Sequence, residues 1–134
     1  FAFMMAEAYQ RGWHTVGDTQ TWVRLGVQSS CVRWGVPSAT AVSFANNVTV
    51  SGMNDIAEAV WVDMFIQGFE SWVQWRRFDY PKLSPPAAAI TGLGVPVRNG
   101  YGTTVPVNNE DSYNAAIAAQ GPDNQDTRIW WDTK

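Results

Sequence analysis

Residues 54–81 read NDIAEAVWVDMFIQGFESWVQWRRFDYP, with no proline before Pro81 and a single glycine, Gly68. Apolar residues recur in this stretch at spacings of three and four, which places them on one face of a helix. They are Trp61, Met64, Phe65, Gly68, Trp72 and Trp75. Ile56, Val60 and Ile66 add apolar groups on other faces, and a helix that is apolar nearly all round belongs inside a helical assembly. The stretch predicts one long helix over 54–81, bent near Gly68, around which the chain is arranged.

The composition restricts the class of protein. The chain has 134 residues, of which 46% are hydrophobic and 16% charged, so it is long enough for one globular core. The net charge of -3 argues against nucleic acid as a partner. A single cysteine, Cys31, excludes an internal disulfide framework and a multi-cysteine metal site.

Two shorter helices are expected before the long one. Residues 2–13 and 19–34 carry helical apolar patterns, and Asp18 is a suitable N-cap for the second. Trp22 and Leu25 are expected on the apolar face of that second helix. A pair of this length over 1–35 is similar to a tetratricopeptide-type unit, which needs neighbours to bury its apolar surface. Residues 38–46 can form a further short helix, and Asn54 is expected to cap the long one.

The chain changes character after Pro81. Residues 82–107 are rich in proline and glycine and predict an irregular, extended segment. Its apolar residues can dock on a core; they are Ile90, Leu93, Val95, Val97 and Val105. A last helix is expected over 110–119, and the tail that ends in Trp130 and Trp131 is expected to pack back on the chain.

Candidate catalytic groups are few. His14 is the only histidine and no partner residues for a nucleophilic site surround it, so no catalytic residue, metal ligand or cofactor site is assigned. Asp63 and Glu70 could form the carboxylate pair of a glycoside hydrolase. An ion pair of Glu70 with Arg76, Arg77 or Arg98 is the favoured interpretation.

Eight tryptophans are a large number for this length, and exposed aromatic rings can stack on sugars. Helical spacing predicts that Trp22, Trp61, Trp72 and Trp75 pack inside the protein. The other four lie near the ends of predicted elements and are freer: Trp13, Trp34, Trp130 and Trp131.

Several motifs, in order along nearly the whole chain, resemble the C-terminal region of the SusD/RagB family. The signature F-x-x-G-x-E-x-W-x-x-x-R-R-x-x-Y-P is matched at Phe65, Gly68, Glu70, Trp72, Arg76, Arg77, Tyr80 and Pro81. The segments AEAYQRGW (6–13), VPVR with Pro96 and Arg98, and RIWWD with Trp130 and Trp131 are similar to further family motifs, as are Tyr101, Asn109, Tyr113 and Ala116. Gly102, Val105 and Ser112 depart from the family pattern.

The resemblance implies a mainly α-helical SusD-like fold with tetratricopeptide-like helix pairs, of which 1–134 would be the C-terminal part of a single domain. It implies a non-catalytic protein that binds oligosaccharides for uptake through a SusC-type TonB-dependent outer-membrane transporter. It also implies a cell-surface location in Bacteroidetes-type bacteria, with a lipid anchor on an N-terminal part absent from this chain. The signature residues are expected to be structural, as are Pro96, Arg98, Trp130 and Trp131 of the further motifs, and ligand contacts are expected mostly upstream.

Two alternatives to oligosaccharide binding remain open. The ligand of the same transport system could be a peptide, or the chain could be a helical-repeat interaction module without a small ligand. If the helices lack neighbours, the chain should also expose a large apolar surface.

Overall fold

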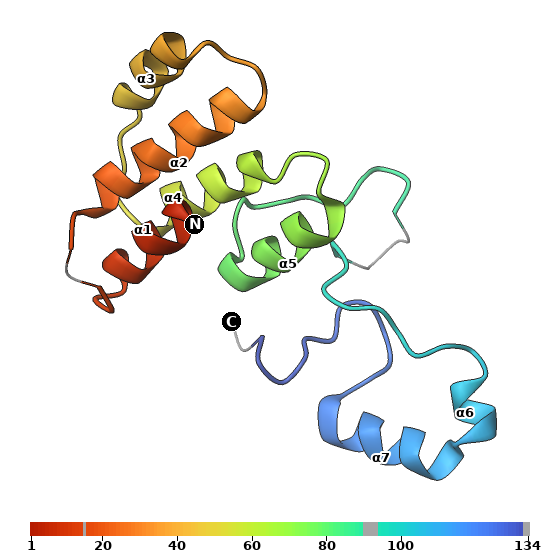
Figure 1. The fold of residues 1–134 in the computed structure, drawn as a ribbon. Helices are drawn as coiled ribbons and strands as arrows, with labels where there is room; N and C mark the ends of the chain where they lie inside the picture. The colour runs from red at the N-terminus through yellow and green to blue at the C-terminus, as the bar shows by residue number, and fades with distance from the viewer. Residues whose placement is uncertain (15, 90–93, 133–134) are drawn as a thin grey trace. The chain divides into compact units, whose positions relative to one another are not determined.

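The structure, a computed structural model, describes residues 1–14, 16–89 and 94–132. These residues contain α-helices and no β-strand, which confirms the predicted fold class. The helices are α1 (Ala2–Gln10), α2 (Thr19–Arg33), α3 (Ser38–Asn46), α4 (Met53–Asp63), α5 (Gly68–Phe78), α6 (Val105–Asn108) and α7 (Glu110–Gln120) (Figure 1). The chain divides into an N-terminal unit, Phe1–Pro81, and a C-terminal unit, Lys82–Lys134.

The core of the N-terminal unit lies where α1, α2 and α4 meet. Ala6, Val23, Ile56 and Val60 form its buried centre, and Phe3 and Val27 are among the partly buried side chains around it. α3 packs on α2, and α5 packs on α4 (Figure 1). The helix pair expected over 1–35 is therefore present, and it gains the neighbours that its apolar surface needs.

The long helix predicted over 54–81 is wrong, because two helices occupy this stretch. α4 ends at Asp63 and α5 begins at Gly68, so the chain breaks just before the glycine. Ile66 has a φ of 63°, which lies in the left-handed region that branched side chains rarely adopt. Contacts with α2 hold the break: the Phe65 ring packs edge-on against Trp34 at 6.0 Å, and Arg33 pairs with Asp63 at 2.7 Å. These long-range contacts are not visible in the helical periodicity.

The start of α4 also differs from the expectation. Its N-cap is Gly52 and Asn54 lies inside the helix, so Asn54 is not the cap. Asp55 satisfies the free backbone donors instead, accepting from the Ser51 N–H at 2.6 Å and the Gly52 N–H at 3.1 Å. The Ser51 hydroxyl and N–H, with a smaller contribution from Gly52, lower the pKa of Asp55.

Asp18 caps α2, as predicted. Its Oδ1 accepts from the Thr21 N–H at 2.8 Å and its Oδ2 from the Thr21 hydroxyl at 2.8 Å. The buried positions of α2 are Val23 and Gly26, whereas Leu25 is 44% exposed, so the expectation for Leu25 is wrong. Several faces of α2 carry apolar residues. Packing against α1 and α4 buries the face that contains Val23.

The cap at Asp18 leads to a prediction about pH. Bonds from the Thr21 N–H and hydroxyl lower the pKa of Asp18 from 3.8, so the folded state favours the ionised form. The stabilisation is present above pH 3.8 and is lost as the pH falls through the lowered pKa. Asp18→Asn keeps a good capping side chain and removes the titration. Urea unfolding followed by circular dichroism should show the stability difference between wild type and variant at neutral pH and its disappearance in acid. A difference that is constant with pH would contradict this role.

The C-terminal unit combines an irregular segment with α6 and α7. Pro106 lies in the first turn of α6, where it leaves no helical hydrogen bond unmade. The tail packs back on 94–101, as predicted: the Val97 N–H donates to the Gln125 carbonyl at 2.9 Å and the Gly94 N–H to Asp126 at 3.1 Å. Val97 is buried, and Val95 and Val105 are half-buried, whereas Ile90 and Leu93 lie outside the described residues.

Large apolar side chains are exposed on the N-terminal unit. The most exposed of them include Phe1, Met4, Trp13, Phe65, Ile66 and Phe69. Among the described residues, no helix is both long enough and apolar enough to cross a membrane.

Candidate functional site

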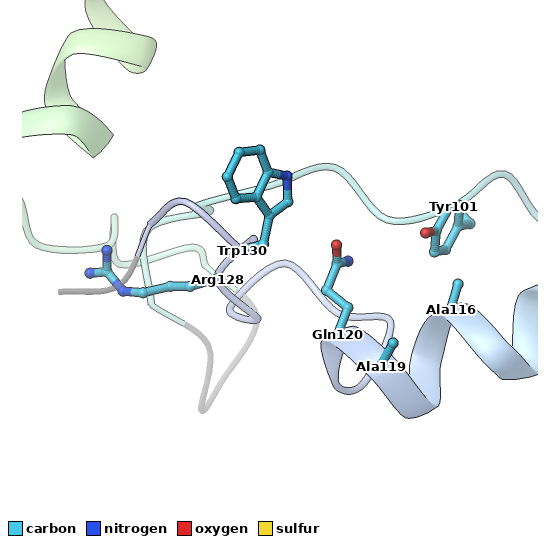
Figure 2. Close-up of a pocket in the computed structure, with 6 residues that line it drawn as sticks. All are labelled: Tyr101, Ala116, Ala119, Gln120, Arg128 and Trp130. Carbon is cyan, nitrogen blue, oxygen red and sulfur yellow. The ribbon is translucent and has the colours of Figure 1, made fainter.

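A pocket of about 360 Å³ lies in the C-terminal unit, between α7 and the segments on either side of it. It is lined by Tyr101, Ala116, Ala119, Gln120, Arg128 and Trp130. In Figure 2 the Gln120 side chain stands between Trp130 and Tyr101, and Ala116 and Ala119 project from α7 below. The small alanine side chains leave the space open, and the two aromatic rings form its sides.

The aromatic rings of this pocket face solvent. Trp130 is 84% exposed and Tyr101 is 41% exposed. A tryptophan that is left in water forgoes the free energy of burying a large apolar surface. This confirms Trp130 as one of the freer tryptophans. Exposed aromatic rings beside a polar amide are suited to ligands with both apolar faces and hydrogen-bonding groups.

The charge of the pocket is balanced within the protein. Among the described residues, Arg128 is the only charged side chain that lines it, and its Nη1 donates to Asp132 Oδ1 at 2.6 Å. Asp132 is buried, with 4% of its surface exposed, and this burial holds the carboxylate in place next to the arginine. In Figure 2 the Arg128 side chain extends away from Gln120. Gln120 is therefore the polar group available at the centre of the pocket.

One carboxylate supports the wall that contains Tyr101. Asp123 Oδ1 accepts from the Tyr101 N–H at 3.0 Å and from Arg98 Nη2 at 3.2 Å, and Oδ2 accepts from the Tyr113 hydroxyl at 3.2 Å. The Tyr101 and Tyr113 rings meet edge-on at 5.7 Å. Loss of hydration and then the charge of Asp123 raise the pKa of Tyr113, so this phenol keeps its proton and donates.

A family model matches residues 1–102, about three quarters of the chain. It is the model of a SusD-like family with the description "Starch-binding associating with outer membrane". The chain belongs to the SusD-like family. No curated protein matches the chain.

Solved structures of other SusD-like proteins share the fold. A Bacteroidetes protein described as AC2a SusD-like has 25% identity and a TM-score of 0.85, with 99% of this chain and 29% of that chain covered. A chitin-binding SusD homologue from Flavobacterium johnsoniae has 25% identity and a TM-score of 0.77, with 99% and 35% covered. A further chitin-binding protein has 26% identity and a TM-score of 0.82, with 99% and 32% covered. The chain thus spans about a third of the length of these proteins.

The SusD-like signature makes packing and polar contacts within α5, with the residues after it and with α4. The Arg76 guanidinium lies 4.0 Å from the centre of the Trp72 ring, and Trp75 donates to the Pro81 carbonyl at 2.9 Å. The Tyr80 hydroxyl reaches Glu58 at 3.4 Å. Trp75 is buried, as predicted, but Trp61 is 37% exposed, so its predicted burial is wrong.

The ion pair expected for Glu70 is replaced by another. Glu70 lies on the exposed side of α5. Arg77 pairs with Glu7 of α1 instead, and Glu7 also accepts from Arg11 at 2.7 Å. Arg98 pairs with Asp123. Two motifs far apart in the sequence, AEAYQRGW and the signature, therefore meet at the buried carboxylate of Glu7.

The two carboxylates considered for glycoside hydrolysis lie in different surroundings. Asp63 closes α4 and binds Arg33 at 2.7 Å, while Glu70 belongs to α5 and faces solvent. His14 lies near the Trp22 ring, at 6.5 Å between ring centres. Across 1–14, 16–89 and 94–132, no group of three or more histidine, cysteine, aspartate or glutamate side chains could hold a metal ion.

A second pocket, of about 250 Å³, lies at the break between α4 and α5. Its lining is Trp61, Val62, Met64, Phe65, Ile66 and Ser71. All of these side chains except Ser71 are apolar, so the surface offers little to orient a polar ligand. It is better suited to packing than to recognition, and the pocket beside Trp130 is the stronger candidate.

Sequence reasoning singled out Trp130 and noted Tyr101, but it missed Gln120 and Asp123. Gln120 directly follows the helix expected over 110–119, and Asp123 comes after Gly121 and Pro122. Neither carries a local signal, because their roles depend on contacts with residues that are distant along the chain.

Proposed function

We propose that the protein is a non-catalytic, cell-surface subunit that binds oligosaccharides, and that the pocket of Tyr101, Gln120 and Trp130 holds one sugar unit. The exposed indole of Trp130 carries the proposal, since 84% of this residue is accessible beside a polar amide. A pyranose ring presents C–H groups that can pack on an aromatic face and hydroxyls that need hydrogen bonds. Gln120 can both donate to and accept from such hydroxyls.

The size and charge of the pocket support a neutral ligand. Its volume of about 360 Å³ is at the lower end of the range for small-molecule sites, roughly 300–1,000 Å³. Arg128 is already paired with Asp132, so the described part of the chain offers no unbalanced positive charge in this pocket for an acidic sugar. The descriptions of the family and of two structural relatives, starch-binding and chitin-binding, name neutral glycans.

We also propose the wider setting that the family resemblance implies. The chain would be the C-terminal part of a single SusD-like domain, lipid-anchored at the outer membrane and bound to a SusC-type TonB-dependent transporter. The signature residues would serve as structural supports in that domain. Co-purification of the full-length protein with such a transporter from outer membranes would test the partnership, and recovery of the protein without one would count against it.

The test of the site is a binding measurement with the full-length protein. Titration calorimetry would compare chitin, starch and cellulose oligosaccharides with an acidic oligosaccharide and a mixture of short peptides. Trp130→Ala should weaken binding of the preferred neutral glycan about tenfold or more. Ala119→Phe should also weaken it, because the ring would fill the space between Tyr101 and Trp130.

Ala118→Phe is the matched control, since Ala118 is exposed on α7 and does not line the pocket. Glycan binding that is unchanged by both Trp130→Ala and Ala119→Phe would refute the site. If the protein binds peptides and no glycan, the proposed ligand is wrong. If it binds neither glycans nor peptides, the interaction module is favoured.

A further inference from the structure

The conformation of Tyr101 depends on a residue that does not line the pocket. We propose that Asp123 is a positioning residue, which holds the Tyr101 ring in place before a sugar arrives. This inference rests on the proposed function, because it assigns a role in that same pocket. It concerns affinity and specificity, and Asp123 makes no contact with the ligand in this scheme.

The geometry around Asp123 fixes Tyr101 at its backbone and at its ring. The Tyr101 N–H donates to Oδ1 at 3.0 Å and lies 3.3 Å from Oδ2. The Tyr113 hydroxyl donates to the same carboxylate at 3.2 Å, and its ring meets that of Tyr101 at an angle of 77°. The Arg98 guanidinium lies 5.3 Å from the centre of the Tyr101 ring and also binds Asp123. Asp123 thus binds the Tyr101 backbone directly and also binds the two residues, Tyr113 and Arg98, that lie against the Tyr101 ring.

The local sequence explains why Tyr101 needs this support. Gly100 and Gly102 flank it, and glycines leave a loop with many accessible backbone conformations. A Cβ added at Gly100 would lie 3.2 Å from Asp123 Oδ1, so a glycine there permits the close approach of the carboxylate. Ordering the loop in advance removes part of the entropy that a ligand would otherwise have to offset.

Burial makes the support strong. Arg98 is 6% exposed and pairs with the Asp123 carboxylate, which also accepts from the Tyr101 N–H and the Tyr113 hydroxyl. Hydrogen bonds to a charged acceptor are roughly twice as strong as those between neutral groups. Asp123→Asn preserves the size of the side chain but removes the charge, and it offers one oxygen where the carboxylate offers two.

The experiment uses the full-length protein and the neutral oligosaccharide that binds best in the calorimetric comparison. Tyr101→Ala should weaken binding about tenfold, and Asp123→Asn about fivefold. Tyr113→Phe, which keeps the ring and removes one hydrogen bond, should weaken it about threefold. Asp126→Asn is the control, because Asp126 makes a similar bond to the Gly94 N–H without touching a pocket residue.

A double-mutant cycle separates positioning from a general structural role. In the Tyr101→Ala background, Asp123→Asn should cause little further loss of affinity, because the side chain that it positions is gone. Nuclear magnetic resonance provides a readout that needs no ligand. The Tyr101 amide proton should shift upfield in Asp123→Asn, and that of Gly94 should not.

The outcomes distinguish the two proposals. If Tyr101→Ala leaves glycan binding unchanged, the proposed site is wrong, whatever Asp123 does. If Tyr101→Ala weakens binding but Asp123→Asn and Tyr113→Phe do not, the site stands and the positioning role is wrong. A loss for Asp123→Asn that is equally large in the Tyr101→Ala background would also overturn the positioning role, since it would reflect the fold of the unit.

Discussion

Replacing Glu7 by glutamine is expected to destabilise the N-terminal unit by about 2–3 kcal/mol, because it leaves two arginines without their shared buried carboxylate. Glu7 is 5% exposed and pairs with Arg11 of its own helix and with Arg77 of α5. Breaking a buried ion pair costs roughly 3–5 kcal/mol. The arginine side chains are 33% and 40% exposed and can turn to water, so the expected loss is at or below the lower limit of that range.

Glu70→Gln is the matched control for Glu7→Gln. It changes the acid of the signature motif, which is exposed on α5, and should alter the free energy of unfolding by less than about 0.5 kcal/mol. Urea unfolding followed by circular dichroism at neutral pH measures both variants. Equal losses for the two variants, or a larger loss for Glu70→Gln, would contradict the assignment of Glu7 as the partner of Arg77.

Replacing Gly26 by valine should destabilise the same unit by about 3 kcal/mol through overpacking. Gly26 is buried in α2, and a Cβ at this position would lie 2.5 Å from Cε1 and 2.6 Å from Cζ of Phe3 in α1. Such distances are too short for carbon atoms in contact, so the Phe3 ring must leave its place or α1 must move away. Either movement exposes apolar surface of the core.

Two further variants test this interpretation of Gly26. Gly68→Val makes the same change at the start of α5, where an added Cβ has no atom within 4 Å, and should cause a much smaller loss. Phe3→Ala is destabilising alone, but in combination with Gly26→Val the losses should be less than additive, because the clash is gone. Thermal unfolding of the wild type, the three single variants and the double variant provides the comparison. Fully additive losses would show that Phe3 is not the side chain in conflict with position 26.

Local signals along the chain predicted much of the helical content. Asp18 begins α2 because its side chain and the following backbone donors are close in sequence, and 38–46 matches α3. The helix predicted over 110–119 is α7, which starts at Glu110 and ends at Gln120. The motifs also predicted the family, since they keep their order over most of the chain. Such features depend on residues within a few positions of one another.

The tertiary structure decided the features that join distant residues. The chain breaks between α4 and α5, where Phe65 contacts Trp34 and Asp63 pairs with Arg33 of α2, although the helical pattern runs through the break. Arg77 pairs with Glu7, seventy positions away, and not with the nearby Glu70. The attraction between a carboxylate and an arginine is strongest where burial lowers the local dielectric constant. Burial depends on how the helices assemble.

At the candidate site too, the sequence predicted some features and the tertiary structure decided the others. The sequence alone marked Trp130 as a free aromatic residue near the end of an element, and the structure shows it exposed beside a pocket. The sequence alone could not place Gln120 next to the Trp130 ring, or Asp123 next to the Tyr101 N–H. The turn after α7 brings these residues together. Helices and caps follow from short-range periodicity and hydrogen bonding, whereas a pocket and its support exist only once the chain has folded back on itself.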